Sequence, residues 1–259
     1  MISRRAGMCL LLALAVAVVI AGTLVPRTPQ PLSYHEFADR SGWLGIPNFL
    51  DVASNIVFAA AGLAGLLNLG ERSGGGFIEA NEKWFYVFVF LGLLLTAFGS
   101  SYYHLAPDNA RLVWDRLPMS VVFMALVAAV IAERMSLPAG FWLLPVLLGV
   151  GISSVLEWYS SELHGRGDLR FYAGVQVYAV LVLFVALLLP PRYTRSSDFA
   201  VIACLYVAAK ICETADRQIY SLGHFLSGHT LKHLTAGVAG FWISRMLAKR
   251  QPMQNQFAR

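Results

Sequence analysis

Residues 84–104 read WFYVFVFLGLLLTAFGSSYYH, a run with no charged side chain before its terminal histidine. An α-helix rises 1.5 Å per residue, so this run spans about 30 Å, the thickness of the hydrocarbon core of a bilayer. Small polar and ionisable side chains gather towards its end, at Ser100, Ser101 and His104. The run therefore predicts a helix that crosses a membrane and carries polar groups at one of its ends.

Seven further stretches of similar character lie on either side of this run. They cover approximately residues 8–25, 49–69, 114–134, 140–159, 171–189, 199–214 and 224–247. Each is apolar on nearly all sides and lacks the alternation of a transmembrane β-strand. The expected fold class is all-α, a polytopic membrane bundle of seven core transmembrane helices within residues 31–250, preceded by an N-terminal helix.

The composition of the whole chain supports this expectation. The chain has 259 residues, of which 57% are hydrophobic and 14% charged, and its mean hydropathy is +0.60. Soluble domains contain about 25% charged residues. The net charge of +5 is spread over single residues between apolar runs, so no nucleic-acid partner is expected. The three cysteines lie inside apolar stretches, which argues against a disulfide framework.

The first stretch follows Arg4 and Arg5, as in signal anchors and signal peptides. Its apolar run of about 18 residues is long for a signal peptide. Residues 1–30 are therefore interpreted as a signal anchor, with a cleaved signal peptide as the alternative. The positive-inside rule places these arginines and the basic residues 245–250 in the cytoplasm. Residues 251–259 are then a cytoplasmic tail of an integral, multi-pass membrane protein.

Ionisable residues within membrane spans are costly, so each one marks a candidate functional site. His229 and His233 are four residues apart, which places both side chains on one helical face, one turn apart. Ser100 and His104 have the same spacing, and Asp115 opens the next stretch on the same side of the membrane. We expect these five side chains to reach one depth, near the non-cytoplasmic face.

This set of side chains predicts a hydrolytic metal centre. Three neutral imidazoles with an open fourth position are the ligand arrangement of a catalytic zinc. A neighbouring carboxylate can accept a proton from the attacking water, and a hydroxyl can stabilise an oxyanion. A His-x-x-x-His pair alone is weak evidence, because the same spacing also occurs in hydrogen-bonded pairs at helix interfaces.

Three sequence motifs resemble those of the alkaline ceramidases. The motifs are Ser100-Ser-Tyr-Tyr-His104, Asp115-Arg-Leu-Pro-Met119 and His229-Thr-Leu-Lys-His233, and residues 48–55, NFLDVASN, are similar to a serine–asparagine stretch in the first core helix of that family. The ceramidases belong to a wider group of seven-helix membrane hydrolases that includes the adiponectin/progestin receptors. The resemblance covers approximately residues 34–247 and implies the same fold.

The resemblance also implies a role for each site residue. Zinc would be bound by His104, His229 and His233, with Asp115 as the general base and Ser100 as the partner of the oxyanion. The implied reaction is hydrolysis of the amide bond of a ceramide-like membrane lipid to a fatty acid and a sphingoid-type amino alcohol. The implied cofactor is zinc, and the active site would lie near the non-cytoplasmic face.

Other polar residues have two interpretations. The animal enzymes carry an acidic calcium site before the first core helix, and residues 34–40 do not match it, so calcium is not carried over. His224 is either a spare ligand or an interface histidine. Lys232 lies about 100° from the faces of its histidine neighbours, so no role at the metal is expected. Six further residues at the ends of the apolar stretches are expected to form either a headgroup pocket or a set of interhelical ion pairs. They are Glu157, Trp158, Lys210, Glu213, Asp216 and Arg217.

Two functions of other classes remain open at this point. In a receptor or scaffold the zinc would be structural, with no significant turnover, and the chain outside the bundle would recruit an effector. A bis-histidine haem protein would need histidine pairs facing each other near the middle of the membrane. The clustering of the histidines at one depth with a carboxylate and a hydroxyl favours the hydrolase. The sequence does not indicate the oligomeric state.

Overall fold

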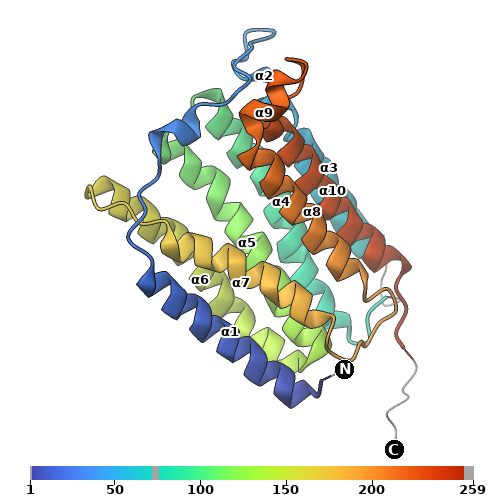
Figure 1. Cartoon of the computed structure of the whole chain (residues 1–259). Coiled ribbons are helices and arrows are strands. Elements are labelled where there is room, and N and C mark those ends of the chain that lie inside the picture. The colour runs from blue at the N-terminus through green and yellow to red at the C-terminus, as the bar shows by residue number, and fades with distance from the viewer. Residues whose placement is uncertain (1, 72–75, 254–259) are drawn as a thin grey trace, which may run out of the picture.

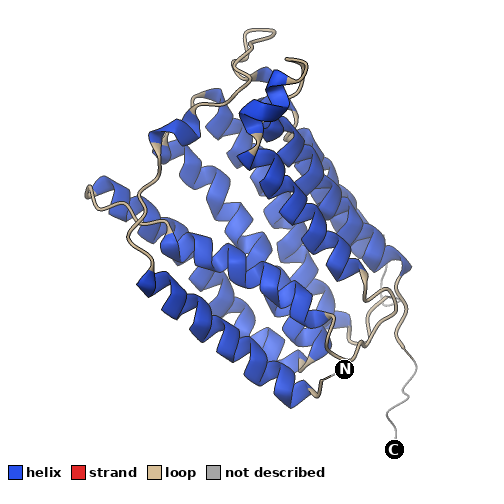
Figure 2. Cartoon of the chain, viewed as in Figure 1, coloured by secondary structure: helices blue, strands red, loops and turns tan. Residues whose placement is uncertain are grey.

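The computed structural model describes residues 2–71 and 76–253, and these residues form helices and loops with no β-strand (Figure 2). The helices are α1 (Arg4–Leu24), α2 (Phe49–Ala53), α3 (Ile56–Glu71), α4 (Lys83–Leu105), α5 (Asn109–Arg134), α6 (Leu137–Leu163), α7 (Arg170–Ala186), α8 (Asp198–Thr214), α9 (Asp216–Ser221) and α10 (Gly228–Lys249), with 3-10 helices η1 (Leu32–His35) and η2 (Ala80–Glu82). The expected all-α class is confirmed. Residues 254–259 of the expected tail lie outside the described residues.

Five segments are long and apolar enough to cross a membrane, as expected for a membrane protein. These segments are Arg4–Leu24, Phe49–Glu71, Ala80–Leu105, Asn109–Arg134 and Leu137–Leu163. The apolar helix α7 and helix α8 are shorter, with 17 residues each. Helix α10 has 22 residues but is less apolar, because His229, Lys232 and His233 lie in its first turns. The count of seven core helices therefore stays a prediction.

The long helices form one bundle around α5 (Figure 1). Most side chains of α5 are buried, and it packs against α4, α6 and α7. Helix α10 packs between α3 and α8, whereas α1 packs on α7 and leaves most of its surface exposed. The start of α1 and the last turn of α10 lie at the same end of the bundle (Figure 1). We call the opposite end, formed by α2, α9 and the first turns of α10, the site end.

The stretch expected as one helix over residues 49–69 is broken into α2 and α3. The Oγ of Ser54 and the Nδ2 of Asn55 both donate to the backbone carbonyl of Asp51, at 3.1 and 2.8 Å. Such local bonds from side chain to backbone compete with the helical ladder. The break turns Ser54 towards α10, where it contacts the histidine cluster described below.

Helices α5 and α10 do not begin where the sequence placed them. Helix α5 starts at Asn109, because the Asp108 carboxylate accepts the backbone N–H of Arg111 at 2.7 Å and caps the first turn. Asp115 therefore lies in the second turn of α5 and is not the residue that opens the helix. Helix α10 begins at Gly228, and His224 lies in the preceding loop with a φ of 53°.

Helices α4 and α5 approach each other closely beside the predicted site. Pro118 lies inside α5 and cannot donate to the carbonyl of Trp114, one turn earlier. A Cβ on Gly99 of α4 would overlap this same carbonyl oxygen, so only glycine allows the contact. The next residues of the two helices are Ser100 and Asp115, and the close approach therefore places them side by side.

We predict that Gly99→Ala destabilises the protein by about 1–3 kcal/mol, because a methyl group overpacks the interface between α4 and α5. The measurement is the denaturation midpoint in detergent. Gly149→Ala is the matched control, since a Cβ at Gly149 in α6 would meet no atom within 4 Å. Alanine there should be neutral or stabilising, because it is the better helix former. Equal midpoints for Gly99→Ala and the wild type would contradict the close packing.

Candidate metal centre

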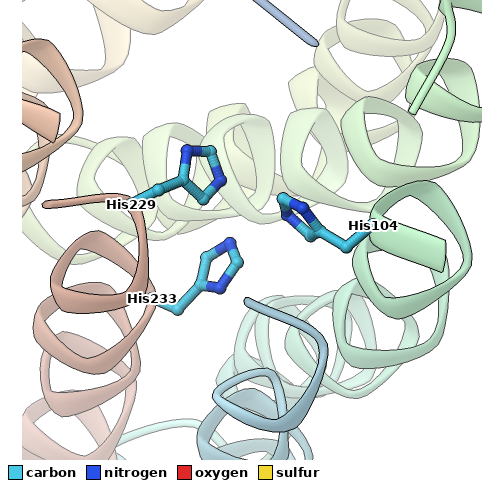
Figure 3. Close-up of side chains that lie close together, drawn as sticks. All are labelled: His104, His229 and His233. Carbon is cyan, nitrogen blue, oxygen red and sulfur yellow. The ribbon is translucent and has the colours of Figure 1, made fainter. Parts of the chain in front are cut away.

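The three histidines predicted as metal ligands lie together at the site end of the bundle (Figure 3). His104 comes from the last turn of α4, and His229 and His233 come from the first two turns of α10. One ligand nitrogen from each ring lies within 4.8 Å of the others, and the ring centroids are 4.8–5.0 Å apart. All three side chains are buried. The cluster can hold one metal ion.

The hydrogen bonding of the rings fits this interpretation. Both ring nitrogens of His104 and the Nε2 of His233 are buried without a hydrogen-bond partner. A buried polar atom left unpaired costs about 1–3 kcal/mol, and a bound metal ion removes that cost. Nitrogen ligands of a tetrahedral site with bonds of about 2.1 Å are roughly 3.4 Å apart, somewhat closer than the observed limit. The donor set suits divalent metals that accept imidazole.

Ser54 orients one ring of the cluster. Its Oγ lies 2.8 Å from the Nδ1 of His233, so the Nε2 of the same ring is the nitrogen left for a metal. Histidines that bind metals usually have their second ring nitrogen fixed in this way. The break between α2 and α3 is thus the feature that supplies the partner of His233.

Two carboxylates hold the first turn of α10, which carries the cluster. The Oδ1 of Asp216 accepts the backbone N–H of His229 at 2.7 Å, and its Oδ2 accepts the N–H of Ala38 at 2.9 Å. The Oδ1 of Asp51 accepts the hydroxyl of Thr230 at 2.7 Å. Carboxylates are stabilised at a helix N-terminus. Both acids therefore position the histidines without belonging to the cluster themselves.

The loop between α1 and α2 covers the cluster from outside the bundle. The buried ring of Phe37 lies 4.6 Å, between centroids, from the rings of both His104 and His229. The sequence predicts no role for Phe37. A single aromatic residue in a loop gives no sequence signal for such a contact.

Two neighbours of Phe37 anchor this loop. The hydroxyl of Tyr34 donates to the Oε1 of Glu213 at 3.0 Å, and His35 bonds to Tyr103 and Asn109 at 2.9 and 3.0 Å. Burial and the nearby Glu213 carboxylate raise the pKa of Tyr34 to about 12, so its hydroxyl remains a donor. Burial lowers the pKa of His35, which favours the neutral ring. Tyr34 and His35 therefore anchor the loop as uncharged groups.

Lys232 contacts the cluster, although its angle on the helix predicts no role at the metal. Its Nζ lies 3.1 Å from the Nε2 of His229 and 2.9 Å from the Oε1 of Glu213. The prediction considered only the angle between side chains on the helix, and the long, flexible lysine reaches around that angle. A metal bound through the Nε2 of His229 must displace this hydrogen bond, after which Glu213 still pairs with the ammonium.

A cavity of about 580 Å³ leads from the site into the apolar interior. Ser100, Asp115 and His233 line its polar end, and the remainder runs between α5, α7, α8 and α10. The hydroxyl of Ser100 faces the carboxylate of Asp115 but is not in ordinary hydrogen-bond geometry with any described group. The shape and lining suit a polar reaction centre joined to a long apolar chain.

The other residues singled out in the sequence as a possible headgroup pocket or set of ion pairs lie in different places in the structure. Lys210 and Glu213 form an ion pair within α8 that lines the cavity. Glu213 also pairs with Lys232 of α10 at 2.9 Å, and this pair is the interhelical one. Trp158 is buried against α5, whereas Glu157 is exposed and does not line the cavity. Arg217 pairs with Glu36 at 3.2 Å, away from the cluster. His224, in the loop before α10, makes an edge-to-face contact with Tyr220 and is not one of the clustered histidines.

No protein-family model matches the sequence, and no curated protein matches it. The resemblance to the alkaline ceramidases therefore rests on the quoted motifs alone.

We predict that the purified protein binds one zinc ion per chain and that His233→Ala loses it, because a ligand is removed. Ser54→Ala should weaken zinc binding by about 10–100-fold, since it leaves the Nδ1 of His233 without its partner. Metal analysis and competition with a chelator measure both effects. Ser101→Ala is the control, because the hydroxyl of Ser101 contacts only a backbone carbonyl in α2. Full zinc retention in His233→Ala would exclude the cluster as the metal site.

Proposed function

We propose that the protein is a zinc-dependent intramembrane amidase related to the alkaline ceramidases. It hydrolyses the amide bond of a ceramide-like lipid to a fatty acid and a sphingoid-type amine. The observation that carries the proposal is that His233 of the buried cluster shares one cavity with Asp115, Ser100 and a long apolar channel. A closed structural metal site would need neither the cavity nor the unpaired hydroxyl.

Zinc is proposed among the possible metals because three imidazoles and one open position are its usual catalytic ligand set. When bound, zinc polarises the amide carbonyl and lowers the pKa of a water molecule towards about 7. The residues of the chain supply the remaining functions. They orient the lipid, move protons and stabilise the negative charge that develops on the carbonyl oxygen.

In the proposed reaction, Asp115 transfers the protons and Ser100 stabilises the negative charge on the carbonyl oxygen. The carboxylate of Asp115 accepts the proton of the attacking water as the carbon–oxygen bond forms. The hydroxyl of Ser100 donates a hydrogen bond to the oxygen of the tetrahedral intermediate. Asp115 then passes its proton to the amide nitrogen as the carbon–nitrogen bond breaks. The fatty acid and the free amine leave, and the carboxylate is restored.

The apolar part of the cavity holds the acyl chain. Its walls include Leu126, Leu183, Ile202 and Ile243, which lie well beyond the polar end along their helices. Burial of an acyl chain among such side chains contributes roughly 0.8 kcal/mol per methylene group. The bilayer is the source of this substrate. We extend the proposal to sidedness, with the site near the non-cytoplasmic face and the C-terminus in the cytoplasm.

The proposal predicts that Asp115→Asn retains zinc but loses activity by about 10²–10⁴-fold, because a general base is removed without loss of a ligand. The assay is release of fatty acid from lipid amides and matched esters by the purified zinc protein, with amides cleaved in preference. Asp108→Asn is the control on the same helix, since asparagine also caps helices well.

Wild-type turnover in Asp115→Asn would show that Asp115 is structural. If the zinc-loaded, folded wild type cleaves no lipid amide or ester, the receptor function becomes the better interpretation.

A further inference from the structure

Arg116 is a buried cation on the wall of the same cavity, and no ion pair neutralises it among the described residues. It follows Asp115 in α5 and is only 5% exposed. Its Nη2 donates to the Oε1 of Gln30 at 2.6 Å. Its Nη1 is buried with no hydrogen-bond partner at all.

Aromatic rings surround the flat faces of this guanidinium. Its central carbon lies 4.1 Å from the ring of Trp158, 4.7 Å from that of Tyr172 and 5.6 Å from that of Tyr34. Cation–π contacts stabilise the charge through the faces and fix the plane of the group. They do not satisfy the N–H groups at its edge, which require an acceptor.

The other charges of the cavity do not supply that acceptor. Glu213 pairs with both Lys210 and Lys232. Asp115 is the only other acid on the cavity wall, so three cations face two acids there. A metal ion on the histidines adds further positive charge. A buried charge without a counter-charge is expensive, and such a group at a cavity is a candidate for binding a charged ligand.

We propose that Arg116 binds an anionic group on the amine side of the scissile amide, so that the preferred substrate is an acidic N-acyl lipid of the N-acyl amino acid type. This inference rests on the proposed amidase function. The acyl chain runs into the apolar part of the cavity, which leaves the amine side at the polar end. Arg116, Tyr34 and Gln30 line that end. The planar fork of a guanidinium matches a carboxylate.

The first test measures binding by metal-free protein in detergent, so it does not depend on turnover. The probes are N-oleoylglycine, which is anionic, and N-oleoylethanolamine, which is neutral and nearly the same size. A charge-assisted hydrogen bond is worth about 1.5–3 kcal/mol, so wild type should bind the anion about 10–100-fold more tightly. Arg116→Gln should lose this preference and keep its affinity for the neutral lipid.

Two further variants separate charge recognition from folding. Arg116→Lys keeps the charge but not the fork, and it should retain a reduced preference for the anion. Arg111→Gln is the matched control, because Arg111 lies on the same helix with its side chain partly exposed and paired with Asp108. Equal binding of the two lipids by wild type would overturn the inference, as would a full preference in Arg116→Gln.

The second test separates this inference from the proposed function. Zinc-loaded wild type is assayed for cleavage of N-oleoylglycine, N-oleoyltaurine, N-oleoylethanolamine and ceramide. Faster cleavage of the two anionic amides supports both proposals, and the carboxylate should exceed the sulfonate if the fork is used. Cleavage without regard to charge overturns the anion site and leaves the amidase intact. A binding preference without any cleavage overturns the amidase and leaves the anion site.

Discussion

Ring nitrogens of His104 and His233 lie buried and unpaired where the end of α4 meets the start of α10, and the surrounding structure keeps them there. The cost of leaving these atoms without partners is large relative to the net stability of a folded domain. Three contacts around the cluster hold these unpaired nitrogens in place. Ser54 fixes one ring, Asp216 holds the backbone of His229, and Phe37 excludes water from above.

The same constraint connects the break in the first core helix with the packing of α4 against α5. A continuous helix over residues 49–69 would not turn Ser54 towards α10. A larger residue at Gly99 would push Asp115 away from Ser100. The first feature interrupts a helix and the second brings two helices into close contact, and both serve the arrangement of polar groups at the site end. Backbone irregularities of this kind are tolerated in membrane proteins where they are enclosed by protein.

The all-helical class and the histidine cluster were predictable from the sequence for a simple reason. Helical periodicity relates residues four apart, and the lengths of the apolar runs bring the ends of successive helices to one depth. The positions of His104, His229 and His233 follow from these two rules. The rules say nothing about which loop residue folds back onto the site, so the contact of Phe37 was not predicted.

Two other outcomes depended on contacts between elements distant in the sequence. The pairing of Lys232 with Glu213 of α8 and the uncompensated charge of Arg116 are visible only once the neighbouring helices are placed. In the sequence, Arg116 is only the second residue of the Asp115–Met119 motif, and it carries no predicted role. The expected helix ends were also imprecise, since α5 begins at Asn109, directly after its cap residue Asp108, and not near residue 114.

The most direct measurement of the central claim is X-ray absorption spectroscopy at the zinc edge on the purified, zinc-loaded protein. We predict three imidazole nitrogens at about 2.0–2.1 Å and an additional oxygen ligand at a similar distance, the coordination of an open catalytic site. The spectrum of His104→Ala should lose one imidazole contribution. A spectrum with sulfur ligands, or with zinc coordinated by oxygen atoms alone, would contradict the assignment of these histidines as a metal centre.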